Sequence, residues 1–194
     1  LDVRAVVMDR GPILPTAPID LAVRDRKNFL LHFSRRRDVE TREFGQPQLE
    51  EVARNIETLV IPPDELNSKQ VSNFVHAGSV EKCVIFGTDL ISDSVLSLLP
   101  ANTINMHLGL SPRYRGSATL FWPFYFLEPQ FSGLTFHRPV KEPDAGAILH
   151  QMTTRLAWGD GIHDVGARTG KEGAVELSRL LLMEPEKWQF SSQK

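Results

Sequence analysis

Thr103-Ile104-Asn105-Met106-His107 is the stretch from which the fold and the chemistry of this chain can be worked out. Its apolar character predicts a buried strand over residues 103–106. Because successive side chains of a strand leave opposite faces, Asn105 and His107 point to the same side of the sheet. Open α/β sheets place their ligands near the carboxyl ends of strands, which is where this pair stands. Together with Asp144 they offer an amide, an imidazole and a carboxylate, the groups that stabilise an oxyanion and move a proton in acyl transfer.

Strands and helices alternate on the amino-terminal side of this stretch. The expected strands are residues 3–8, 58–61, 84–86 and 103–106, and the expected helices contain residues 49–56, 71–75 and 92–99. Asn67-Ser68 is a candidate cap for the second of these helices. Alternation of this kind favours βαβ units around a parallel sheet. The predicted fold class is therefore α/β, with a Rossmann-like open, mostly parallel sheet and helices on both faces.

A hairpin and a helix complete the predicted fold. Residues 133–140 and 148–154 read as two strands joined by the turn Pro143-Asp144-Ala145-Gly146. The last helix carries apolar residues at helical spacing between positions 165 and 181. Residues 1–185 are then expected to form one domain, and residues 186–194 a C-terminal tail.

The composition is that of an ordinary globular protein. Of the 194 residues, 41% are hydrophobic and 24% charged, which argues for a packed core and against disorder. The formal net charge of −2 gives no reason to expect nucleic acid or an anionic membrane as a partner. No apolar run approaches the roughly 20 residues that span a bilayer. The single cysteine, Cys83, predicts a buried thiol in a reducing compartment, and the histidines show no metal-ligand spacing, so no metal is expected.

Two segments are open to two interpretations each. Residues 16–47 predict either a solvated helix face or loop, or an anion-binding lip, because they carry seven basic side chains: Arg24, Arg26, Lys27, Arg35, Arg36, Arg37 and Arg42. A second segment suits either a core helix or a platform for a substrate, because it is rich in aromatic residues: Trp122, Phe124, Tyr125 and Phe126.

Four short motifs follow one another between residues 83 and 152. They are Asn105-x-His107, Ser111-Pro112-x-Tyr114-Arg115-Gly116, Gly133-x-Thr135-x-His137 and Asp144-x-Gly146-x-Ile148-x-x-Gln151. In this order and spacing they resemble the formyltransferase family that uses 10-formyltetrahydrofolate. That family includes glycinamide ribonucleotide, methionyl-tRNA and nucleotide-sugar formyltransferases. The resemblance identifies residues 1–185 as a formyltransferase catalytic domain.

The resemblance also implies a role for individual residues. It makes Asn105, His107 and Asp144 the catalytic residues and His137 a supporting one. A substrate amine would attack the formyl carbon, and the Asn105 amide and a protonated His107 would stabilise the resulting oxyanion. Asp144 would hold the imidazole and relay a proton from the amine, directly or through water.

Two further sets of residues are implied as binding residues. The folate would lie against Phe86, Gly87, Thr88, Asp89, Leu90 and Ile91 on one side and Asp144, Ala145 and Gly146 on the other. The acceptor substrate would meet Ser111, Arg113, Tyr114, Arg115 and Gly116, although the two arginines suit a solvated loop equally well. Thr88 stands where the family has a larger residue, which would reshape the folate pocket.

The expected protein is thus a cytoplasmic formyltransferase that takes a formyl group from 10-formyltetrahydrofolate to a small-molecule amine. Tyr114-Arg115-Gly116 resembles the tRNA and sugar branches of the family more than the purine branch, and the resemblance to the sugar branch implies a nucleotide-linked amino sugar as acceptor. The family's first strand and helix are expected to precede Leu1, a homodimer is an open option, and neither membrane nor nucleic acid is an expected partner. Two alternatives remain: hydrolysis of the formyl donor by water, and an inactive module that binds folate or a nucleotide.

Overall fold

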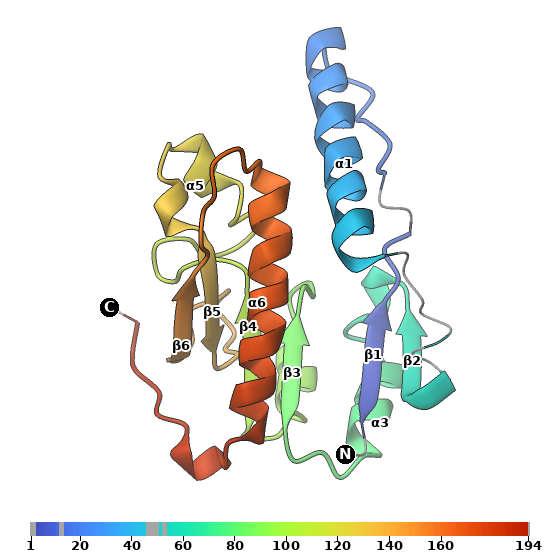
Figure 1. Ribbon diagram of the computed structural model, residues 1–194. Coiled ribbons are helices and arrows are strands. Elements are labelled where there is room, and N and C mark those ends of the chain that lie inside the picture. Colours follow the sequence, from blue (N-terminus) through green and yellow to red (C-terminus); the bar gives the residue numbers. More distant parts are fainter. Residues whose placement is uncertain (1–2, 12–13, 46–50, 52–53, 194) are drawn as a thin grey trace. The chain divides into compact units, whose positions relative to one another are not determined.

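The chain divides into two compact units, residues 1–63 and residues 64–194 (Figure 1). The computed structural model describes residues 3–11, 14–45, 51 and 54–193. Within those ranges no helix combines the length and apolar character needed to cross a bilayer. All residues predicted for the site belong to the second unit.

The first unit contains a parallel pair of strands. Strand β1 (Arg4–Met8) pairs with β2 (Glu57–Ile61), from Arg4 opposite Glu57 to Met8 opposite Ile61. An ion pair joins Arg4 Nη2 and Glu57 Oε1 at 2.6 Å. Both strands were predicted from the sequence. The helix predicted around residues 49–56 lies largely outside the described residues, which exclude Leu49, Val52 and Ala53.

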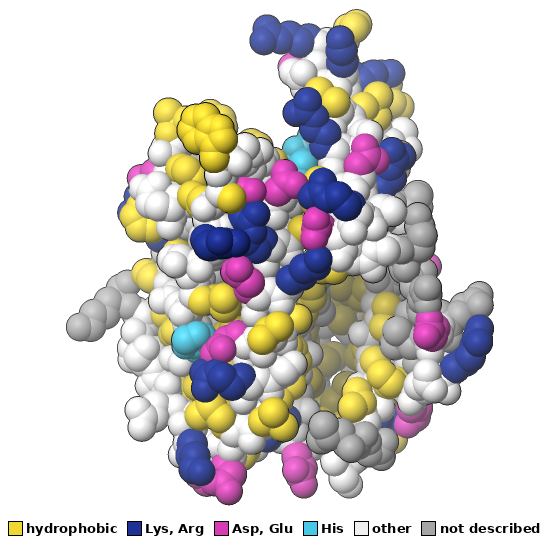
Figure 2. All heavy atoms as spheres, in the orientation of Figure 1, with side chains coloured by type: hydrophobic (Ala, Val, Ile, Leu, Met, Phe, Trp, Pro, Cys, Tyr) yellow, Lys and Arg dark blue, Asp and Glu magenta, His cyan; other side chains and the backbone are white. Residues whose placement is uncertain are grey.

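The basic segment of the first unit is a long helix, α1 (Val23–Phe44). Arg36 pairs with Glu40 at 2.7 Å, and Arg37 pairs with Asp38 at 2.8 Å. Figure 2 shows Lys and Arg side chains along the length of this helix. A charged helix face, one of the two interpretations of this segment, is therefore confirmed, and the anion-binding lip stays a prediction.

The second unit carries the remaining elements, apart from Pro63, the first residue of η1. From Pro63 onward they are η1 (Pro63–Glu65), α3 (Lys69–His76), β3 (Cys83–Phe86), α4 (Asp93–Leu96), β4 (Thr103–His107), α5 (Trp122–Tyr125), η2 (Pro129–Phe131), β5 (Gly133–His137), β6 (Ile148–Thr153), α6 (Ile162–Leu182) and η3 (Pro185–Lys187). The predicted cap of α3 is confirmed, because Ser68 Oγ accepts a hydrogen bond from Val71 N at 3.3 Å. The core interpretation of the aromatic segment is wrong for Tyr125 and Phe126, which are 64% and 57% exposed.

The second unit is built on a four-stranded sheet in the order β3-β4-β5-β6. Strands β3 and β4 are parallel, whereas β4–β5 and β5–β6 are antiparallel. The α/β class, the parallel crossover units and the C-terminal hairpin plus helix are confirmed. The predicted predominance of parallel pairing is not found among the described strands, where parallel and antiparallel pairings are equally numerous, because the hairpin β5–β6 adds two antiparallel pairings beyond β4.

The two faces of this sheet have opposite character. Ile104, Met106, Leu134 and Phe136 face α6 and form the core with Leu180 and Trp188. Helix α6 runs across this face (Figure 1), and Gly173 allows the close approach, since a Cβ there would overlap Met106 and Leu134. The alternate strand positions therefore direct their polar side chains to the other face, where the site lies.

The segment after α6 returns to the sheet. Trp188 is 8% exposed, and its indole nitrogen donates a hydrogen bond to the Leu180 carbonyl at 3.2 Å. Ser191 and Ile148 exchange two backbone hydrogen bonds of 2.8 Å, which adds an antiparallel bridge to β6. Residues 188–193 are thus packed and hydrogen-bonded against the second unit.

Candidate active site

The register of strands β4 and β5 brings Asn105, His107 and His137 onto one face of the sheet. In the antiparallel pair β4–β5, Asn105 lies opposite His137 and His107 lies opposite Thr135. Directly opposed side chains share a face and have neighbouring Cβ atoms. The motifs Asn-x-His and Gly-x-Thr-x-His therefore form one polar surface, because their polar side chains occupy opposed alternate positions on the adjacent strands β4 and β5.

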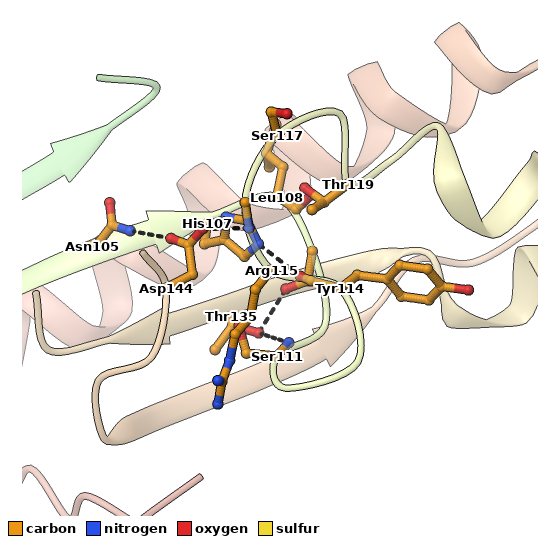
Figure 3. Close-up of polar contacts among 12 residues, drawn as sticks. Asn105, His107, Leu108, Ser111, Tyr114, Arg115, Ser117, Thr119, Thr135 and Asp144 are labelled. Carbon is orange, nitrogen blue, oxygen red and sulfur yellow. Dashed lines mark hydrogen bonds and ion pairs between the residues drawn. The ribbon is translucent and has the colours of Figure 1, made fainter. Parts of the chain in front are cut away.

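Asp144 is the centre of this constellation (Figure 3). Its Oδ1 accepts a hydrogen bond from Asn105 Nδ2 at 3.1 Å and lies 3.3 Å from His137 Nε2. Its Oδ2 accepts from the Gly116 backbone N–H at 2.9 Å and lies 3.2 Å from His107 Nδ1. Burial raises the pKa of Asp144, but the hydrogen bond from His137, the positive charge of His107 when that ring is protonated, and the Gly116 N–H outweigh it and hold that pKa below its ordinary value. The carboxylate is therefore ionised at neutral pH.

His107 has an acceptor at each ring nitrogen. Nε2 lies 2.9 Å from the Tyr114 carbonyl oxygen, and Nδ1 faces Asp144. Burial lowers the pKa of His107 below its ordinary value of 6.5, although the Tyr114 carbonyl and Asp144 act in the opposite direction. In the neutral ring, Nε2 donates its hydrogen to the Tyr114 carbonyl, and the lone pair of Nδ1 faces Asp144 Oδ2. A proton placed between Nδ1 and Oδ2 is therefore shared by both atoms. Gly109 permits this contact, because a Cβ there would lie 2.6 Å from His107 Nε2.

His137 and Asn105 complete the hydrogen-bond network. His137 Nδ1 donates to the Arg138 carbonyl at 2.8 Å, and its Nε2 lies 3.0 Å from Asn105 Nδ2 and 3.3 Å from Asp144 Oδ1, within hydrogen-bonding distance of both. Both amide hydrogens of Asn105 are thus directed at His137 and Asp144. Its amide oxygen, at the partly exposed edge of the site, receives no hydrogen bond from the residues that the structure describes.

The Asp-x-Gly motif has a steric cause. Asp144 has a φ of 51°, in the left-handed region that non-glycine residues rarely occupy. At Gly146 a Cβ would overlap the Arg138 carbonyl oxygen. Glycine at this position lets the turn approach β5. The close approach places the Asp144 carboxylate beside His107 and His137.

Two motif residues hold the loop that follows β4. Thr135 Oγ1 accepts from Ser111 N at 3.0 Å and donates to the Gly109 carbonyl at 2.7 Å. Gln151 Nε2 donates to the Ser111 carbonyl at 2.7 Å and to Thr135 Oγ1 at 2.9 Å. The loop is thereby fixed over the histidine face of the sheet, which brings Tyr114 and Gly116 to their contacts with His107 and Asp144.

The predicted acceptor-binding residues have different surroundings. Arg113 is engaged by Glu128, with Nη2 2.5 Å from Oε1, and Tyr114 donates its hydroxyl to the same carboxylate at 2.7 Å. Arg115 instead donates Nε to the neutral amide oxygen of Gln193 at 2.8 Å. Sequence reasoning missed Glu128 and Gln193, and no pattern in the chain pairs them with the loop.

The predicted folate loop follows β3, the parallel neighbour of β4. Phe86 pairs with Met106 in register, so residues 86–91 leave the same edge of the sheet as His107. Asn67 fixes the loop, because its Nδ2 donates to the Leu90 carbonyl at 2.9 Å and its Oδ1 accepts from Ser92 N at 2.7 Å. Leu90 in this loop is 67% exposed. Among the described residues no group of three His, Cys, Asp or Glu could hold a metal.

A family model described as formyl transferase matches residues 29–181. The chain belongs to the formyl transferase family. This membership confirms the resemblance seen in the four motifs and makes the chain a formyltransferase. The match includes all seventeen predicted site residues, which span residues 86–146.

Solved structures of formyltransferases share the fold. Glycinamide ribonucleotide transformylase 1 from Symbiobacterium toebii is 19% identical with a TM-score of 0.62, over 75% of this chain and 74% of that one. A formyltransferase from Anoxybacillus kamchatkensis, in complex with UDP-4,6-dideoxy-4-formamido-L-AltNAc and tetrahydrofolate, is 19% identical with a TM-score of 0.58, over 73% and 72%. A sugar N-formyltransferase from a Shewanella species is 16% identical with a TM-score of 0.59, over 99% and 73%.

Proposed function

We propose that this formyltransferase moves the formyl group of 10-formyltetrahydrofolate to the primary amine of a nucleotide-linked amino sugar. The observation that carries the chemistry is the ionised Asp144 carboxylate set 3.2 Å from His107 Nδ1. Burial lowers the pKa of His107 and so favours the neutral ring, and the Tyr114 carbonyl, 2.9 Å from Nε2, places the one proton of that ring at Nε2 rather than Nδ1. The pair is therefore ready to receive a proton.

The attacking amine provides that proton. Its nitrogen forms a bond to the formyl carbon, and the carbonyl oxygen takes up negative charge. The amine proton passes to the Asp144–His107 pair, directly or through water, and turns His107 into an imidazolium that stabilises the oxyanion. The bond between the formyl carbon and N10 of the folate then breaks, and N10 receives the proton. The products are the formamide and tetrahydrofolate.

Asn105 has two tasks in this proposal. One amide hydrogen holds Asp144 Oδ1, and the other, bound to His137 Nε2, is the hydrogen that can turn to the oxyanion. A donor that points at the oxyanion is worth about 3–4 kcal/mol in a site from which water is excluded, and the loss of the contact with His137 reduces this gain. His137 keeps the amide in position while the site is empty of substrate.

The proposed acceptor rests on charge and on relatives. Glu128 compensates the charge of Arg113, whereas the partner of Arg115 among the described residues is an uncharged amide. Arg115 therefore offers positive charge for the diphosphate of a nucleotide-linked sugar. The Anoxybacillus kamchatkensis enzyme was solved with such a product and tetrahydrofolate.

The test is the consumption of 10-formyltetrahydrofolate with a panel of amines. Nucleotide-linked amino sugars, glycinamide ribonucleotide, methionyl-tRNA and an amine-free control are compared, with mass spectrometry of the product. Tetrahydrofolate and formamide in equal amounts, with an amino sugar alone, are the expected result. Formate release at the same rate without an amine would establish a hydrolase instead. Folate binding by calorimetry with no turnover of any amine would leave a binding module.

A further inference from the structure

We infer that Gln193 is a positioning residue that locks the Asp144 turn to the acceptor-binding loop. This role rests on the proposed function, because the turn holds the proposed proton acceptor. The residue lies in the segment after α6, far in sequence from the four motifs.

Every hydrogen-bonding group of the Gln193 side chain is used at this junction. Nε2 donates to the Asp144 carbonyl at 2.8 Å and to the Gly146 carbonyl at 2.6 Å. Oε1 accepts from Arg115, with 2.8 Å to Nε and a second contact to Nη2. One side chain thus joins the turn on one side to the loop on the other.

The junction matters because the same two segments also meet inside the site. The Gly116 N–H, next to Arg115 in the chain, donates to Asp144 Oδ2 at 2.9 Å. This N–H is one of the groups that keep the carboxylate ionised. Gln193 joins the same turn and loop a second time, outside the site. Its amide therefore determines how far Gly116 can move away from Asp144.

The turn also requires an external support. A left-handed φ at a non-glycine residue costs about 1 kcal/mol or more and persists where surrounding contacts fix it. Asp144 has such a φ, and Gln193 binds the carbonyl of Asp144 itself. The bridge of 2.8 Å hydrogen bonds between Ser191 and Ile148 sets Gln193 in register with the turn.

The experiment compares Gln193→Ala and Gln193→Glu with Gln189→Ala in the full chain. Gln189 is a matched control, since it is exposed and lies in the same segment. The glutamate variant keeps an acceptor for Arg115 but sets a carboxylate against two carbonyl oxygens. Steady-state kinetics of formyl transfer, melting temperature and amide hydrogen exchange at Gly116 by NMR are measured for each.

The expected result is a loss of kcat that exceeds the loss of folate binding. Gln193→Ala should lower kcat about tenfold and raise the KM for the folate by less than this factor, because the reacting groups are misplaced while residues 86–91, the other side of the predicted folate site, keep their contacts. Exchange at Gly116 should accelerate about tenfold in both Gln193 variants, with the melting temperature within a few degrees of wild type. Gln189→Ala should match the wild type in all three measurements.

Two results would overturn the inference. One is Gly116 exchange at the wild-type rate in both Gln193 variants, whatever their activity. The other is equal kcat in Gln193→Ala and Gln189→Ala. If the wild-type chain itself transfers no formyl group, the proposed function fails, and the exchange rates still decide whether Gln193 holds the two segments together.

Discussion

Replacing Asp144 by Asn removes the carboxylate and keeps its shape. The carboxylate accepts from Asn105 Nδ2 at 3.1 Å and from Gly116 N at 2.9 Å, through different oxygens. An amide has one oxygen and one NH2 group, so one of these two donors must face another donor. We therefore expect a loss of about 1–3 kcal/mol in the free energy of unfolding, the cost of one unsatisfied polar group.

The loss of activity should be much larger than the loss of stability. Without the carboxylate, His107 has no partner with which to bind the amine proton, and removal of such a base costs about 10²–10⁴ in rate. At 1.36 kcal/mol per decade this is about 3–5 kcal/mol in the activation free energy. Single-turnover formyl transfer at saturating substrates measures it, with urea unfolding as the parallel readout.

Asp38→Asn is the matched control for this substitution. Asp38 is 61% exposed and pairs with Arg37 on α1, so the same chemical change there should leave kcat unchanged within about twofold. If Asp144→Asn keeps its turnover within about tenfold of wild type while folate binding is intact, Asp144 does not receive the proton and the proposed mechanism is wrong.

Three other substitutions test the site. Gly146→Ala should lower the free energy of unfolding by about 3 kcal/mol, because its Cβ overlaps a backbone carbonyl. Gly166→Ala is the control for urea unfolding, because a Cβ there would lie 3.6 Å from Leu120 Cδ1, an ordinary van der Waals distance, and it should not lower the free energy of unfolding. His107, whose pKa is lowered from 6.5 on folding, destabilises the fold as pH drops below 6.5, since the unfolded chain then binds more protons. His107→Gln should flatten this part of the stability–pH curve, and an unchanged slope would contradict the assignment. Arg115→Ala should raise the KM of the anionic acceptor about tenfold, whereas Arg113→Ala, whose charge a glutamate already balances, should change it less than about twofold.

Local pattern was sufficient for the strands that the structure describes and for one face of the site. The period of two in residues 103–107 placed Asn105 and His107 together, and the core confirms it, since Ile104 and Met106 pack under α6. Burial of alternate side chains is a property of the strand itself and can be read from a single segment. The turn at Asp144 was also visible, because Pro143-Asp144-Ala145-Gly146 is typical of a hairpin turn, whereas the left-handed φ of Asp144 came from the structure.

The partners of these residues were not visible in the sequence. Glu128 binds Arg113 and Tyr114, Asn67 fixes the folate loop, and Gln193 joins Asp144 to Arg115. Each contact joins segments between 14 and 78 residues apart in the chain. The local sequence around a charged or amide side chain does not indicate which distant residue it will contact, so composition and periodicity do not identify that partner.

The sequence by itself determined the family, the order of the strands that the structure describes, and the choice of Asn105, His107 and Asp144 as candidates. Tertiary structure alone decided how these three side chains lie together. The antiparallel register of β5 sets His137 opposite Asn105, and the approach of the Asp144 turn to β5 sets one carboxylate between two histidines. The physical reason is that hydrogen bonds and proton affinities depend on distances of a few ångströms between atoms, and those distances exist only once the strands have paired.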